Sequence, residues 1–200
     1  MSSLELFAAL VGAVSVYLSV RENVWSWPTA IVNVLLYVVV FHRAKLYADM
    51  GLQVVYAVIS AYGWYHWLHG GENRGELRVS RTPRREALLL PLLVVAGAAA
   101  LGTFFSRVTD ASLPYLDSSL TATSLAAQWM MTRKYVESWI VWIAVDVVYV
   151  PMFLFKQLFP TAALYAVFLV LAVMGFVQWR WSLRARDARR GVRGAANERA

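Results

Sequence analysis

Hydrophobic positions along this chain gather into seven long segments, and polar or turn-forming residues separate them. Few charged residues interrupt these segments. They are Leu4–Val20, Pro28–Phe41, Leu46–Leu68, Ala87–Phe105, Ser118–Thr132, Trp139–Phe155 and Pro160–Trp179. A helix needs about 20 apolar residues to cross a bilayer, with a range of roughly 17–25. The pattern predicts an all-α integral membrane protein with seven transmembrane helices, in which the two shortest segments extend into their flanks or lie shielded by neighbours.

The chain also matches itself without gaps when Arg21 is aligned with Arg133 and each later position follows in step. Over positions 21 to 67 this repeat offset gives 14 identities in 47 aligned pairs. The matches include Trp27 with Trp139 and Gly63 with Gly175, residue types that a general apolar bias does not readily duplicate. A fixed offset is the signature of an internal repeat.

Each copy of this repeat holds three predicted helices, and the segment Ala87–Phe105 joins the copies. Three helices and one further crossing return the chain to its starting side, so both copies point the same way. SWEET sugar transporters are built from parallel repeats of this kind, and repeated transporters bind substrate near the midplane between the repeats. We therefore predict a 3+1+3 parallel repeat. Its parts are a first repeat (1–69), a basic loop with a linker helix (70–115), a second repeat (116–181) and a basic tail (182–200).

Composition and charge agree with a chain embedded in a bilayer. Hydrophobic residues make up 60% of the chain and charged residues 16%, against about half and about 25% in soluble domains. The net charge of +7 suggests nucleic-acid binding, but the placement of the charges argues against it. With seven spans, 15 of the 19 Lys and Arg residues fall on one side of the membrane. The positive-inside rule then places the N-terminus outside and the C-terminus in the cytoplasm, with the tail as a topology signal near anionic lipid.

Several kinds of chemistry find no support in the sequence. The chain has no cysteine, and His66 and His69 have no third metal ligand in view, so we expect neither a metal nor another cofactor. A GxxxxGK[ST] loop, an HExxH motif and a GxSxG motif are all absent, which disfavours an ATP-driven pump and a membrane enzyme. Transport is the favoured class.

Polar positions inside the predicted spans differ between the two copies. The unequal pairs are Asn33/Val145, Gln53/Tyr165, Gln128/Val16 and Asp146/Val34. Polar groups in hydrocarbon are costly and usually face a bundle interior or a wet cavity. An asymmetric polar set on a symmetric frame suits an asymmetric ligand. Hydrogen bonding between helices is the alternative interpretation.

Helical spacing places the polar residues on shared faces with aromatic ones. The third predicted helix carries Gln53, Tyr56, Ser60, Trp64 and Trp67 on one stripe, and the fifth carries Thr121, Ser124 and Gln128. The predicted substrate-binding residues are Asn33, Tyr37, Gln53, Trp64, Trp67, Thr121, Gln128, Trp142, Asp146 and Tyr149. Asp146 is the most costly, at about 2.5–3.5 kcal/mol near a span centre on insertion scales. It can be protonated, bind a hydroxyl-rich ligand, complement a cation or couple transport to protons.

The segment from Trp27 to Trp67, WPTAIVNVLLYVVVFHRAKLYADMGLQVVYAVISAYGWYHW, closely resembles the PnuC family of bacterial vitamin transporters. The features that carry the resemblance are Trp27-Pro28, Asn33, Tyr37, the KLYADMGLQ stretch and the WxxW at its end. The second half agrees in outline, and the resemblance covers residues 4 to about 181. It implies a SWEET-like fold in a bacterial inner membrane and uptake of nicotinamide riboside without ATP hydrolysis. It further implies trapping of the substrate by a cytoplasmic kinase and assembly as a homotrimer.

Three alternatives stay open on the sequence alone. The substrate can be another vitamin, thiamine or riboflavin, since relatives of the family are associated with both. The carrier can be coupled to protons through Asp146. The same fold can also serve a membrane sensor or scaffold that transports nothing.

Overall fold

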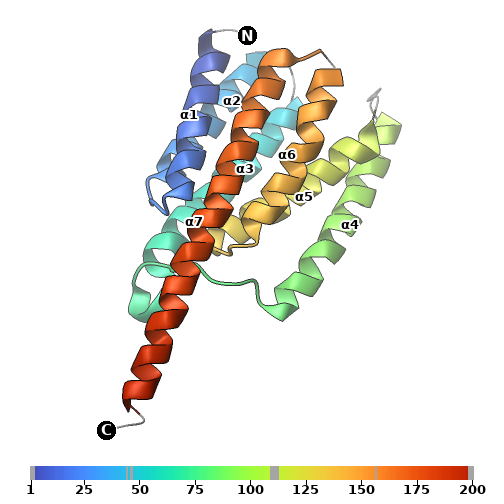
Figure 1. Ribbon diagram of the computed structural model, residues 1–200. Coiled ribbons are helices and arrows are strands. Elements are labelled where there is room, and N and C mark those ends of the chain that lie inside the picture. Colours follow the sequence, from blue (N-terminus) through green and yellow to red (C-terminus); the bar gives the residue numbers. More distant parts are fainter. Residues whose placement is uncertain (1–2, 44, 46, 109–112, 156, 198–200) are drawn as a thin grey trace.

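The computed structural model describes residues 3–43, 45, 47–108, 113–155 and 157–197. Within these residues the chain forms seven α-helices and one short 3-10 helix (Figure 1). They are α1 (Ser3–Val20), α2 (Ser26–Arg43), α3 (Tyr47–His69), η1 (Glu72–Arg74), α4 (Arg84–Val108), α5 (Pro114–Thr132), α6 (Ser138–Phe155) and α7 (Phe159–Asn197). The prediction of an all-α chain with seven helices is confirmed. Leu46, the first residue of the third hydrophobic segment, lies outside the described residues, as do Lys156 and Arg199, two of the 19 basic residues.

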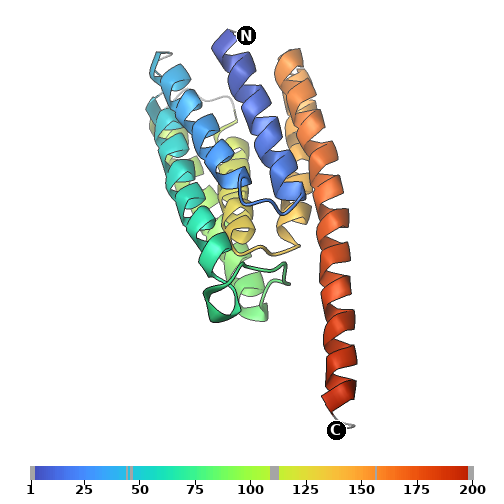
Figure 2. The ribbon, with the colours of Figure 1, turned by 90° about the vertical axis from the view of Figure 1, so that its left-hand side faces the viewer.

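Six helices close into a ring, and the seventh packs on the outside. Neighbours around the ring are α1, α2, α3, α5, α6 and α7, and α7 packs against α1 to close it. Helix α4 packs on α5 and stands at the edge of the bundle in Figure 1. The N-terminus lies at one end of the bundle and the C-terminus at the other, as Figures 1 and 2 both show.

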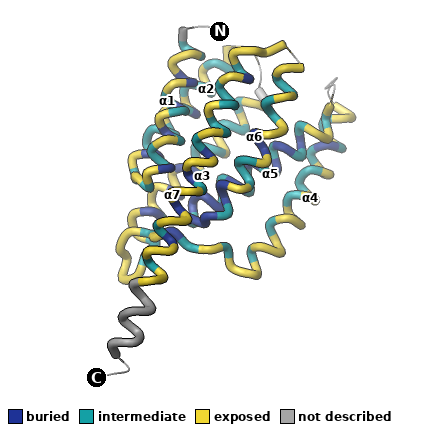
Figure 3. Tube along the Cα trace, viewed as in Figure 1, coloured by how far each residue is buried: buried dark blue, intermediate teal, exposed yellow. Residues whose placement is uncertain are grey.

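Apolar side chains cover much of the outer surface. Leu88, Leu92 and Val95 on α4 are each more than 60% exposed, and exposed positions run along the outside of the helices (Figure 3). By length and composition, three described helices could cross a membrane alone: Arg84–Val108, Ser138–Phe155 and Phe159–Ala188. Helix α1 is apolar but shorter. An exterior of this kind suits lipid rather than water.

Helix α7 is longer than the hydrophobic pattern predicted. The segment assigned as a basic tail continues the helix to Asn197, and residues 198–200 lie outside the described part of the chain. Alanine and arginine are strong helix formers, so a helix can continue here after hydrophobic residues give way to basic ones. Arg186 also anchors the extension, because its Nη1 donates a hydrogen bond of 2.6 Å to the Val79 carbonyl.

The repeat offset reappears in the geometry. Helix α6 begins and ends at the positions that the offset assigns to the ends of α2, and α7 begins at the position that it assigns to the start of α3. The turns repeat as well. Glu22 and Lys134 have φ of 55° and 56°, and Lys45 and Gln157 both have φ of 58°. Few residues other than glycine adopt this left-handed conformation, so its recurrence at matched positions shows that the chain turns in the same way in both halves.

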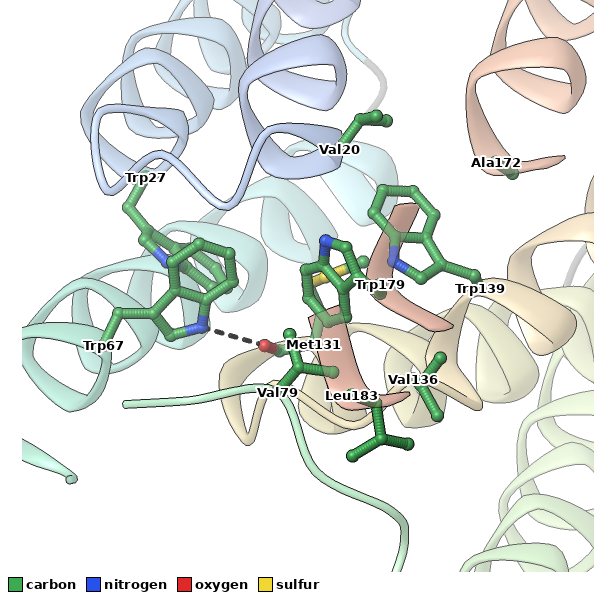
Figure 4. Packing of buried hydrophobic residues seen from close by; sticks show 10 residues of the cluster. All are labelled: Val20, Trp27, Trp67, Val79, Met131, Val136, Trp139, Ala172, Trp179 and Leu183. Carbon is green, nitrogen blue, oxygen red and sulfur yellow. Dashed lines mark hydrogen bonds between the residues drawn. The ribbon is translucent and has the colours of Figure 1, made fainter. Parts of the chain in front are cut away.

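A layer of four tryptophans forms the core at one end of the ring (Figure 4). The rings of Trp67 and Trp179 lie next to each other, with 5.8 Å between their centroids. Trp67 makes an edge contact with Trp27, and Trp179 makes one with Trp139, each with 5.3 Å between ring centroids. The Trp67 Nε1 donates to the Met131 carbonyl at 3.0 Å. In the matching bond of the other copy, the Trp179 Nε1 donates to the Ser19 carbonyl at 3.0 Å. Each half of the chain is therefore bonded to the other.

Glycine makes this tryptophan layer possible. A Cβ at Gly63 would lie 2.5 Å from the Trp27 ring, and a Cβ at Gly175 would lie 2.5 Å from the Trp139 ring. Both distances are far below van der Waals contact. The two matched glycines thus let an indole ring pack directly on a helix backbone.

Candidate binding cavity

A cavity of about 770 Å³ lies at the centre of the ring. All six ring helices contribute to its wall, and α4 does not. Cavities that bind small molecules typically span about 300–1,000 Å³. The interior of the ring therefore has room for a ligand of the size of a vitamin or nucleoside.

Seven of the ten residues predicted to bind substrate line this cavity. They are Asn33, Gln53, Thr121, Gln128, Trp142, Asp146 and Tyr149. Their stripes converge because the ring turns one face of each helix toward the centre. Asp146 is buried, at 4% exposure, near the middle of α6.

The structure places the other three predicted residues elsewhere. Trp64 points outward and is 39% exposed. Trp67 is buried in the tryptophan layer, where its Nε1 is already bonded to Met131. Tyr37 is half-buried and stacks on Phe41 with 5.7 Å between ring centroids. Among these three, none lines the cavity.

Asn33 has a structural bond in addition to its place in the wall. Its Nδ2 donates to the Ala8 carbonyl at 2.6 Å and so ties α2 to α1. Gly12 makes room for this amide, since a Cβ there would lie 3.0 Å from the same nitrogen. One of the two amide N–H groups of Asn33 is thus used within the protein.

Four buried polar groups in the cavity wall have no hydrogen-bond partner among the described residues. They are the Oγ atoms of Ser26 and Ser60 and the indole nitrogens of Trp27 and Trp139. Buried donors and acceptors are usually satisfied, because leaving one unpaired costs about 1–3 kcal/mol. The deep end of the cavity therefore holds several polar groups that the described part of the protein leaves unpaired.

The charged residues in the wall are all acidic. Asp49, Asp117 and Asp146 line the cavity, whereas no Lys, Arg or His does so among the described residues. Asp117 belongs to the first turn of α5 and Asp49 to the first turn of α3. The cavity thus favours a cation and disfavours a phosphate, which proteins bind with Arg and Lys.

Aromatic rings line the side of the cavity formed by α6 and α7. Tyr149 stacks on Phe153, and the centroid of the Tyr165 ring lies 4.9 Å from the ring centroid of each of them. Trp142 adds an indole one turn before Asp146. A flat ring can stack on such a wall, and a positively charged ring gains from cation–π attraction as well.

Residues matched by the repeat offset face the cavity together. Eleven such pairs have both members in the wall, including Val34 with Asp146 and Gln53 with Tyr165. Three of the four unequal pairs noted in the sequence therefore present both of their members to one ligand. The exception is Asn33, because Val145 is buried outside the cavity wall.

The two ends of the cavity differ. At the open end, where the N-terminus lies, the lining residues Asp49 and Leu158 are exposed. At the other end, Trp27, Trp139 and Met131 are each 5% exposed or less and form a floor. The cavity is therefore open at one end and closed at the other.

A strap formed by residues 75–83 crosses behind this floor. Its Ser80 exchanges two backbone hydrogen bonds of 3.0 Å with Lys134 and Val136. The Lys134 Nζ donates to the Leu77 carbonyl at 3.0 Å and lies 3.5 Å from the Glu22 carboxylate. Burial lowers the pKa of Lys134, and the charge of Glu22 opposes this shift. The strap thus holds the ends of both halves together.

Several residues of the cavity wall were not predicted from the sequence. Asp49 and Asp117 lie in first helical turns, where a carboxylate usually indicates interaction with the helix dipole. Trp27 and Trp139 were noted as a matched pair of the repeat and not as binding residues, yet both form the cavity floor. Tyr165 was noted only as the partner of Gln53. Its place opposite Gln53 in the repeat was the available signal.

An apolar helical exterior around a buried polar cavity is the architecture expected of a helical membrane transporter. The sequence profile of one family, described as "Nicotinamide mononucleotide transporter", matches residues 2–181. The chain belongs to this family, and its resemblance to PnuC is confirmed.

Similar proteins include transporters of more than one vitamin by name. The nicotinamide riboside transporter PnuC of Escherichia coli (strain K12) is 25% identical, over 94% of this chain and 90% of the relative. The riboflavin/roseoflavin transporter RibM of Streptomyces davaonensis is 26% identical, over 96% and 90%. A crystal structure of the vitamin B3 transporter PnuC aligns with a TM-score of 0.68 at 23% identity, covering 90% of this chain and 83% of that one.

Proposed function

We propose that this chain is a membrane carrier for nicotinamide riboside. The observation that carries the proposal is the acidic and aromatic wall of the central cavity, with three aspartates and no basic residue among the described residues. Nicotinamide riboside has a flat cationic ring and a hydroxyl-rich sugar, which fit these two kinds of wall. A mononucleotide would bring a phosphate beside carboxylates. The wall therefore favours the nucleoside over the nucleotide that the family description names.

Each wall residue takes a role by its chemistry in this proposal. Trp142 and Tyr149 stack on the nicotinamide ring, and Asp146 offsets its charge. Gln53, Gln128, Thr121 and Asn33 hydrogen-bond the ribose hydroxyls or the amide. The proposal leaves Tyr37, Trp64 and Trp67 outside direct contact, since none of them is in the cavity wall.

All seven helices cross the membrane in this proposal, as two parallel three-helix repeats joined by α4 in the SWEET manner. Three features support this arrangement, because each recurs at positions matched by the repeat offset. They are the helix ends, the left-handed turns and the hydrogen bonds of Trp67 and Trp179. The N-terminus faces outward and the basic end faces the cytoplasm of a bacterial cell, by the positive-inside rule. The cavity then opens to the outside, and the tryptophan floor and strap seal the inner side.

Transport in this proposal is facilitated diffusion, with a cytoplasmic kinase that traps the substrate, and the carrier assembles as a homotrimer. The proton-coupled alternative rests on Asp146 and predicts that an uncoupler abolishes uptake. The riboflavin alternative is favoured by the similarity to RibM. A sensor on the same fold predicts binding without uptake into vesicles.

Calorimetric titration of the purified protein with nicotinamide riboside, nicotinamide mononucleotide, thiamine and riboflavin tests the proposal. We expect nicotinamide riboside to bind most tightly. Asp146→Asn should weaken its binding by roughly 1–3 kcal/mol, because a buried carboxylate no longer offsets the cationic ring. Preferred binding of riboflavin, unaffected by Asp146→Asn, would replace the proposal with the alternative. Preferred binding of the mononucleotide would show that the acidic wall does not select against phosphate.

A further inference from the structure

A second, smaller hollow of about 240 Å³ lies on the outer side of α6 and α7, at the end of the bundle sealed by the tryptophan floor. Its lining divides by chemistry. Val136, Ile140, Phe176 and Leu183 form an apolar part, and three arginines and one glutamate form a polar rim. The arginines are Arg81 from the strap and Arg180 and Arg184 from α7.

The rim has a net positive charge that the protein does not neutralise. Arg81, Arg180 and Arg184 are exposed, and none forms an ion pair with a residue that the structure describes. The one carboxylate, Glu137, is engaged elsewhere, because its Oε2 accepts hydrogen bonds of 2.9 Å from the backbone N–H and the hydroxyl of Thr82. The Arg180 guanidinium also lies over the Phe176 ring, 5.2 Å from its centroid. A guanidinium stacked on a ring keeps its N–H donors at its edge, so three guanidinium groups are available to one anion, and guanidinium pairs well with phosphate oxygens.

The position of this hollow along α7 coincides with the edge of the apolar surface. Before it, Val170, Val173 and Val177 are 46–60% exposed, as expected for side chains that face lipid tails. At the level of the rim, Trp181 is 69% exposed, and exposed tryptophans mark the membrane–water interface. The arginines therefore stand where lipid headgroups lie, and Ile140 of the same hollow, 48% exposed, is available to an acyl chain.

We propose that this hollow, the arginine groove, binds an anionic glycerophospholipid. The phosphodiester lies among Arg81, Arg180 and Arg184, and the start of an acyl chain covers Ile140. Basic pockets between membrane helices on the cytoplasmic side are a known way to hold acidic headgroups. The inference is separate from substrate binding, because none of these residues lines the central cavity.

Native mass spectrometry of the full chain in neutral detergent tests the proposal, with phosphatidylglycerol and phosphatidylcholine of equal chain length. We expect phosphatidylglycerol to bind more tightly. The combined variant Arg81→Gln, Arg180→Gln, Arg184→Gln should lose about fivefold in affinity per arginine, or roughly 100-fold in all. The matched control is Arg74→Gln, Arg78→Gln, Arg85→Gln, which removes the same charge from the same end of the molecule and should change affinity less than twofold.

The outcomes separate the possible sources of binding. An equal loss in the control variant would show general attraction to a basic surface and would overturn the groove. Equal binding of the two lipids would do the same. Displacement of the lipid by an equal concentration of inorganic phosphate would assign the rim to a soluble anion instead. Substrate affinity, measured in the same variants, should stay unchanged, which distinguishes failure of this proposal from failure of the carrier assignment.

Discussion

Single residues show how far chemistry alone can identify a binding site. Asp146 was singled out because a carboxylate in a span is costly, and it lies in the cavity wall. Trp64 and Trp142 were both predicted to bind substrate, yet only Trp142 faces the cavity. Helical phase places a residue within about a third of the circumference of a helix. Helical phase does not say whether that face of the helix packs on another helix, faces the cavity or lies on the outer surface.

The two tryptophans provide a matched test at this scale. Trp142→Ala should weaken substrate binding by about 2 kcal/mol or more, as expected for an aromatic anchor in a buried pocket. Trp64→Ala should leave affinity within twofold, because the ring lies on the outer surface. Calorimetry on the purified variants measures both. Equal losses would mean that the cavity wall has been misidentified.

At the scale of helices, the matched glycines explain how the two halves pack in the same way. Gly63 of α3 and Gly175 of α7 each accept an indole from the preceding helix of their own half. In the sequence, the two glycines are identical residues at positions matched by the repeat offset. The sequence does not indicate which aromatic ring each glycine faces. The structure gives the reason for the match, since any side chain at either position would displace a tryptophan.

Alanine substitutions within one helix test this packing. Gly63→Ala should destabilise the protein by about 1–3 kcal/mol, because the added methyl group overlaps the Trp27 ring. Gly51→Ala in the same helix α3 meets nothing within 4 Å and should be neutral or stabilising by up to about 1 kcal/mol. Thermal unfolding in detergent compares the two. A Gly63→Ala variant as stable as Gly51→Ala would contradict the tight indole contact.

At the scale of the whole molecule, the ring of six helices determines what the carrier can do. One end of its cavity is exposed, and the other is sealed by four tryptophans, two matched indole bonds and the strap. Passage of a ligand requires the sealed end to open. Each half donates one indole hydrogen bond to the other half, at matched positions. We therefore expect both bonds to break together when the sealed end opens.

The absence of cysteine makes the proposed orientation directly testable. Leu158→Cys, at the open end, should react with a membrane-impermeant maleimide in intact cells. Arg78→Cys, on the strap, should react only after the cells are permeabilised. The cysteine-free parent chain gives the background for both. The reverse pattern would invert the orientation and place the open cavity on the cytoplasmic side.

The amino-acid sequence was enough to predict the all-α fold, the number of helices and seven residues of the cavity wall. These follow from local patterns, because hydrophobic runs, fixed offsets and helical phase are properties of neighbouring or matched residues. It also located Asn33, Gln53, Gln128 and Asp146, the polar residues that the two halves do not share.

Which side chains meet could be seen only once the helices were placed in space. The tertiary structure placed Trp67 in the core, turned Trp64 outward, and brought Asp49 and Asp117 into the wall from helix ends. It also extended α7 through the predicted tail and placed Arg81 in the same hollow as two arginines of α7. These outcomes depend on contacts between helices distant in sequence, whose relative rotation is set by packing of the whole ring and is not encoded by any one segment.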